Sequence, residues 1–172
     1  MRRTWPAVVL AVLVVSLGGC GSDDDAKASK AISDSIVKSS KDSSTELLTM
    51  RRKDADCIGD ALVDKIGSEK LQKYGLLTKD MKSKGAINTA KMSATDAKAA
   101  TGVLFDCTDV EAMVESAVNR SDAVSKEMKA CVTRLLTEDT LRPMFTQIFQ
   151  GKQDEATQAL TEPLGRCVRT GG

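Results

Sequence analysis

The chain has 172 residues, with 25 basic and 24 acidic side chains and a formal net charge of +1. This balance argues against a nucleic-acid binder, which would carry a strong basic excess. The sequence has no histidine, so it lacks the commonest general base and metal ligand, and with it any Ser-His or Cys-His catalytic pair. We therefore expect no catalytic residue, no metal site and no cofactor, in a protein that is not an enzyme.

Residues 1–19 have the composition of an export signal. Arg2 and Arg3 give a charged start, an apolar run extends from residue 7 to residue 17, and Gly18 and Gly19 follow. A charged start, an apolar stretch and small residues at the end are typical of a secretory signal peptide. The apolar run is shorter than the roughly 20 residues that a membrane-spanning helix needs. We therefore expect a signal peptide over residues 1–19, and not a retained span.

The last residues of this segment carry a motif. Leu17-Gly18-Gly19-Cys20 resembles the lipobox of bacterial lipoproteins. In that family the cysteine thiol receives a diacylglyceryl group, the chain is cut before the cysteine, and fatty acids such as palmitate hold the protein on the membrane. Two or more acyl chains anchor a protein stably to a membrane, whereas a single chain gives only marginal membrane binding. The resemblance implies a protein attached through lipidated Cys20 to the extracytoplasmic face of the cell membrane, with membrane lipid as a partner. A secreted protein with an incidental cysteine is the alternative.

A polar segment follows the cysteine. Residues 20–46 are dominated by Ser, Asp, Lys and Ala, a composition that buries too little apolar surface to offset the entropy of ordering. We expect a flexible tether over residues 20–46, with a short helix inside 28–39 as the alternative. The basic run at 51–53 then either touches anionic headgroups or is the solvated start of a helix.

Residues 47–172 are predicted to form a helical, disulfide-stapled domain. Apolar residues recur there at helical spacing, which predicts an all-α fold, a compact bundle of about six short helices. Ser93 and Asp109 are placed to cap two of these helices. Pro143 is expected near a helix start, and Pro163 is expected to kink the last helix. The apolar stripes cover residues 55–66, 97–107, 110–117, 124–136, 141–149 and 156–167.

Four cysteines remain once Cys20 is set aside. An even set in an exported chain predicts two disulfides, and three pairings are possible. The first and third cysteine each open a helical stretch, and the second and fourth each close one. Aligning the two closing stretches also matches Leu104 with Leu164. This approximate repeat favours the pairs Cys57–Cys107 and Cys131–Cys167, with the other pairings left open. Because all four lie on apolar stripes, we expect both bridges to lie inside the bundle.

The first apolar stripe carries a second resemblance. Residues 55–67 (ADCIGDALVDKIG), followed by 71–77 (LQKYGLL), resemble a pattern that recurs in small actinobacterial lipoproteins and secreted proteins without an assigned activity. The resemblance covers about 20 residues and, loosely, the later cysteines. It implies a helical, disulfide-bonded exported domain and brings no functional residues with it.

Three groups of residues invite a chemical interpretation. Asp56, Asp60 and Asp64 share one helix face and suit a weak cation site, an acidic patch for a partner or, as we prefer, a solvated surface. Tyr74 is either an exposed contact residue at a loop or, as we prefer, packs its ring at a helix end with its hydroxyl outward. The residues Met144, Phe145, Ile148 and Phe149 line a groove or, as we prefer, belong to the core.

These features favour a non-enzymatic interaction or structural module of the cell envelope, with an envelope protein as its partner. A carrier of a small apolar ligand or lipid is the alternative, and a carboxylate-based hydrolase is the least favoured. An internal apolar cavity would indicate the carrier, and a pair of buried carboxylates in a cleft would indicate the hydrolase. A filled core with an exposed apolar or charged patch would indicate the interaction module.

Overall fold

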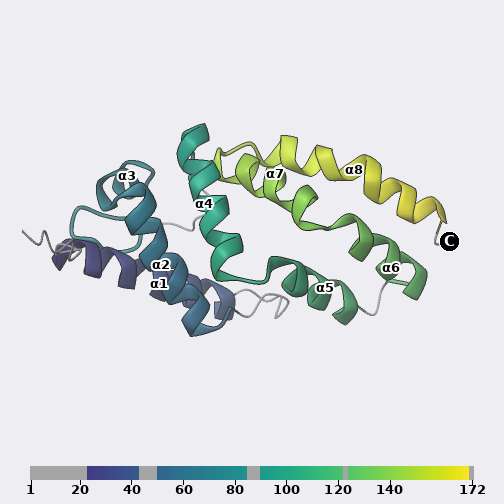
Figure 1. The fold of residues 1–172 in the computed structure, drawn as a ribbon, viewed down its shortest axis with the longest axis horizontal. Coiled ribbons are helices and arrows are strands. Elements are labelled where there is room, and N and C mark those ends of the chain that lie inside the picture. The colour runs from purple at the N-terminus through teal and green to yellow at the C-terminus, as the bar shows by residue number, and fades with distance from the viewer. Residues whose placement is uncertain (1–22, 43–49, 85–89, 122–123, 171–172) are drawn as a thin grey trace, which may run out of the picture.

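The computed structural model describes residues 23–42, 50–84, 90–121 and 124–170. The predicted signal peptide and Cys20 lie outside these ranges. Over the described residues the chain forms eight helices (Figure 1) and no strand, so the predicted all-α fold is confirmed. The helices are α1 Asp23–Asp42, α2 Arg52–Ile66, α3 Ser68–Lys73, α4 Ala94–Cys107, α5 Val110–Arg120, α6 Lys126–Leu135, α7 Glu138–Phe149 and α8 Gln153–Thr170.

Helix α1 occupies most of the segment expected to be a flexible tether. Its side chains Ala28 and Ile32 are buried in the core, so the prediction is wrong for residues 23–42. Small residues let the backbones of α1 and α2 approach closely at one point: a Cβ atom on Gly59 would lie 2.5 Å from the backbone oxygen of Ser29. Composition misses such an interface because close backbone approach requires few large apolar side chains.

Polar contacts fix the direction of α1 against α2. Just past the middle of α1, Asp34 pairs with Arg52 at the start of α2. Near its beginning, Asp25 accepts a hydrogen bond of 2.8 Å from the hydroxyl of Ser68, the first residue of α3. The two helices are therefore antiparallel, and the start of α1 lies beside the start of α3.

Most of the buried core lies between α1, α2, α3 and α4. Leu62, Leu71 and Val103 are fully buried there, and each such side chain stabilises the fold by about 1.5–3 kcal/mol relative to exposure. Phe149 of α7 belongs to the same cluster, and Phe145 and Ile148 pack against it. The preferred interpretation as core is therefore confirmed for these three residues, whereas Met144 is half-buried and is not part of this cluster.

The second half of the chain is more open. Helix α7 contacts α4 and α8, α8 contacts α6, and α6 contacts α5. These helices therefore pack in a row, in the order α4, α7, α8, α6 and α5, and not around a common centre. Helix α6 contains no fully buried residue. In Figure 1 these helices extend away from α4 toward the C-terminal end of the long axis, opposite α3 and the start of α1.

The local signals for helix starts and kinks are only partly reflected in the structure. The hydroxyl of Ser93 accepts from the backbone N–H of Asp96, and Asp109 accepts from Ala112, so both predicted caps are confirmed. Pro143 is the sixth residue of α7 and not part of its first turn, so that placement is wrong. Helix α8 continues on both sides of Pro163.

Candidate functional site

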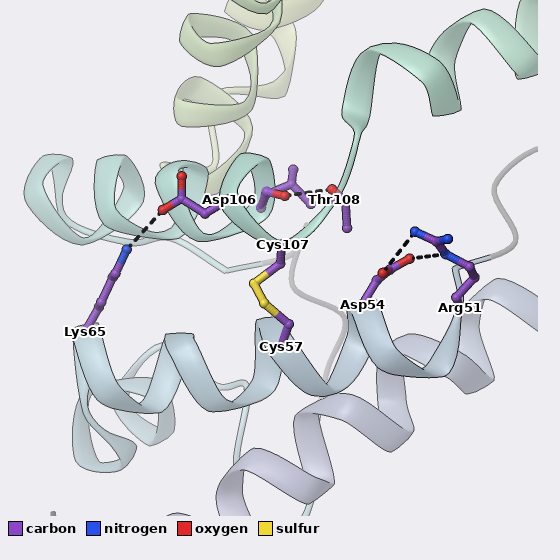
Figure 2. The surroundings of a disulfide bond; sticks show 8 residues. Arg51, Asp54, Cys57, Lys65, Asp106, Cys107 and Thr108 are labelled. Atoms are coloured by element: carbon purple, nitrogen blue, oxygen red, sulfur yellow. Dashed lines mark hydrogen bonds and ion pairs between the residues drawn. A yellow bond between two sulfur atoms is a disulfide. The ribbon is translucent and has the colours of Figure 1, made fainter.

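The first disulfide clamps α2 to α4. Figure 2 shows Cys57 in the middle of α2 bonded to Cys107, the last residue of α4, with an S–S distance of 2.01 Å. An ion pair of 3.2 Å between Lys65 and Asp106 joins the same two helices. Cys57 is exposed, so the prediction that both bridges lie inside is wrong for this one.

The second disulfide joins Cys131 of α6 to Cys167 of α8, with an S–S distance of 2.00 Å. Cys167 is fully buried, as expected for a bridge on the apolar stripes. The structure thus brings together the two pairs that the internal repeat favoured. This bridge supplies part of the α6–α8 contact in a region where few side chains are buried.

A groove lies beside the second disulfide. It has a volume of about 470 Å³ and an almost wholly apolar lining, and it opens to solvent. Helices α6 and α8 each contribute a pair of apolar residues four positions apart, and α5 contributes its last turn. Val168 is 60% exposed and is the one large hydrophobic side chain with that exposure in the described part of the chain. The lining residues are Ala117, Val118, Ser121, Val124, Met128, Val132, Leu164 and Val168.

This groove escapes prediction from the sequence, because every apolar stripe is expected to face the core. The sequence does contain one signal. Val168 directly follows Cys167, so the apolar stripe on α8 is wider than one neighbouring helix can cover. The bridge to Cys131 fixes which side of α8 faces α6. Leu164 and Val168 are then left at the open edge.

The proposed acidic face on α2 does not form a cluster. Asp56 pairs with Arg52 at 2.9 Å and accepts a hydrogen bond from Ser33, whereas Asp60 and Asp64 are exposed. Across the described ranges, no group of three or more acidic or cysteine side chains is arranged to hold a metal ion. The arrangement agrees with the preferred interpretation of a solvated helix face.

The basic run at the start of α2 is largely neutralised. Arg51 pairs with Asp54 at 2.7 Å, and Arg52 pairs with both Asp34 and Asp56. Arg52 lies beside the middle of α1, where Asp34 is, and the predicted lipid attachment precedes the beginning of α1. A headgroup contact by this run therefore gains no support from the geometry.

A buried carboxylate links α3 to α4. Asp96 accepts a hydrogen bond of 2.7 Å from the hydroxyl of Tyr74 and one of 3.0 Å from Lys70, and the same hydroxyl accepts from the backbone N–H of Ser93. The Tyr74 hydroxyl therefore points inward, contrary to our expectation. Its hydrogen bond is the main reason that the pKa of Asp96 lies below its usual value; the contacts with Lys70 and Ser93 add to this, and burial opposes it. This network holds the start of α4 in place.

No helix among the described residues is both long enough and apolar enough to cross a membrane. Comparisons with protein-family models, curated proteins and solved structures find no match to this chain. The site is therefore interpreted from its own chemistry.

Proposed function

We propose that this protein is a lipid-anchored, non-enzymatic binding module of the cell envelope, which presents the groove between α5, α6 and α8 to a partner. The observation that carries the proposal is the contrast between a filled core around α2 and an open apolar groove at the far end of the molecule. An exposed apolar hollow with polar margins is typical of an interaction site.

The position of the groove suits an anchored protein. Cys20 precedes Asp23 by three positions, and three residues reach at most about 11 Å. An acyl group on Cys20 would hold the start of α1 close to the lipid headgroups. The groove lies toward the opposite end of the long axis (Figure 1), where an envelope partner has access.

A carrier of a small apolar ligand is the second candidate, supported by the volume and apolar lining of the same groove. Ligand pockets of about 300–1,000 Å³ usually bury most of their ligand. This groove is open along one side, so a small ligand would keep part of its apolar surface in water. The open geometry favours a macromolecular partner that covers that side.

Photo-crosslinking in whole cells tests the proposal. A photoreactive residue at Val168, in the groove, is compared with one at Gln158, an exposed position earlier in α8. We expect an adduct in the membrane fraction that forms from position 168 and not from 158. The adduct should move out of that fraction when Cys20→Ala is added. Equal labelling from positions 168 and 158, or labelling from position 158 alone, would contradict the binding role of the groove.

A further inference from the structure

The surface around the groove has a charge that differs from that of the whole chain. The whole chain is almost neutral. The two stretches of sequence that contribute lining residues, 117–132 and 164–170, contain two acidic residues, Asp122 and Glu127. The basic residues in the same segments are Arg120, Lys126, Lys129, Arg166 and Arg169. The apolar hollow is therefore bordered by a local excess of positive charge.

Part of this charge is available to a partner. Arg169 directly follows Val168 and forms no ion pair with any described residue. Lys129 donates a hydrogen bond of 2.8 Å to the backbone oxygen of Asn119 at the end of α5, so it keeps its full charge at the margin. Arg166 pairs with Glu162. Lys129 and Arg169 are on α6 and α8, the two helices that each line the groove with an apolar pair.

We propose that the occupant of the groove is one amphipathic helix of a protein partner, with Asp or Glu side chains bordering its apolar face. This inference rests on the proposed function and specifies the partner. A helix laid into a groove contributes anchors about one turn apart, which matches the pairs Met128–Val132 and Leu164–Val168. Its own body then covers the open side of the groove. Carboxylates at its edges match Lys129 and Arg169, whereas a basic helix would meet like charge.

Binding of synthetic peptides tests this inference. The probes are two helical peptides of about four turns with the same leucine face, one bordered by Glu and the other by Lys. The protein is the full chain carrying Cys20→Ser, with both disulfides intact. By fluorescence anisotropy at low salt, we expect the Glu peptide to bind about tenfold more tightly than the Lys peptide, because the basic residues at the margin attract the carboxylates of the first peptide and repel the ammonium groups of the second. The difference should nearly vanish at 1 M salt, where the Debye length is about 3 Å.

Two variants and a control locate the binding. Val168→Asp places a carboxylate in the groove at an exposed position, so it should abolish binding while circular dichroism stays unchanged. Arg169→Glu should remove most of the preference for the Glu peptide, and Gln158→Glu, the control, should have no effect. Equal binding of both peptides, or binding that survives Val168→Asp, would overturn the inference.

Two further outcomes assign the groove to another occupant. Displacement of the Glu peptide by a long-chain fatty acid at stoichiometric concentration would indicate a lipid carrier. Dimerisation that Val168→Asp abolishes would indicate a second copy of the chain. Either result overturns the helix partner. A position-168 adduct in cells without any peptide preference would overturn this inference alone and leave the binding role in place.

Discussion

The two halves of this molecule are stabilised in different ways. Helices α1 to α4 enclose a continuous cluster of buried leucine, isoleucine, valine and alanine side chains. Helices α5 to α8 bury far fewer, and α6 buries none completely, although its Cys131 is bonded to the fully buried Cys167. A region with a small core commonly depends on a covalent staple. We infer from this comparison that the bridge, more than buried side chains, holds α6 against α8 beside the open groove.

The halves meet at the α4–α7 contact. Phe105 of α4 and Phe145 of α7 stack edge to face with ring centroids 6.0 Å apart, and the guanidinium of Arg142 lies 4.4 Å above the ring of Phe105. The hydroxyls of Thr101 and Thr146 are 2.9 Å apart and share a hydrogen bond. These contacts attach the open half to the filled core, so α7 is stabilised by side chains from both halves.

Removing the second disulfide should give the largest effect. Its loop spans 36 residues, and the chain-entropy model assigns such a bridge about 4 kcal/mol. In the double variant Cys131→Ala, Cys167→Ala we expect fast hydrogen exchange in α6 and α8, with α2 and α4 still protected. Removing Cys57 and Cys107 instead, across a comparable 50 residues, should leave α2 and α4 protected by their core. Uniform loss of protection in the first variant would show that the two halves unfold as one unit.

Adding a methyl group to α2 tests whether α1 belongs to the filled half. Gly59→Ala would place a Cβ atom 2.5 Å from the Ser29 oxygen, and overpacking of this kind costs about 1–3 kcal/mol. We expect a lower urea midpoint and weaker protection in α1. Gly102→Ala is the matched control, because a Cβ atom at that position would meet no other atom within 4 Å and Ala favours a helix interior by up to about 1 kcal/mol. If both changes stabilise equally, α1 is not packed as described.

Acid should weaken the α3–α4 junction by a smaller amount. The pKa of Asp96 in the folded protein lies below its ordinary value of 3.8, chiefly because Tyr74 donates a hydrogen bond to it. A lowered folded pKa contributes stability that is fully present above the unfolded value and is lost as the pH falls through the folded value. Urea unfolding from pH 6 to pH 2 should therefore show a decline below about pH 4.

The variant Asp96→Asn provides the control for this decline. It should be less stable at pH 6 and lose less stability on acidification than the unmodified protein. Some decline should remain, because hydrogen bonds from Lys30 and Arg52 also lower the pKa of Asp34. If the pH profile of Asp96→Asn matches that of the unmodified protein, Asp96 does not contribute to the loss of stability in acid.

Much of the fold was predictable from particular residues. The periodic stripes located α2 and α4 to α8, Ser93 and Asp109 marked two helix starts, and the repeat around the cysteines indicated the pairing. Helix α3 was missed because it is six residues long and buries a single residue, Leu71. The inward hydroxyl of Tyr74 was missed because its partner Asp96 lies 22 positions away.

The sequence alone determined the helical class, because the 3.6-residue period and the caps are local properties of the chain. It also carried the signature of export and lipidation, which remains a prediction for Cys20. Only the tertiary structure decided that α1 joins the core, since that depends on the close approach of Ser29 to Gly59. It also decided which apolar side chains line an open groove: the half-buried Leu164 and the exposed Val168 have the same helical pattern as buried residues, and their exposure depends on which helices pack beside α8.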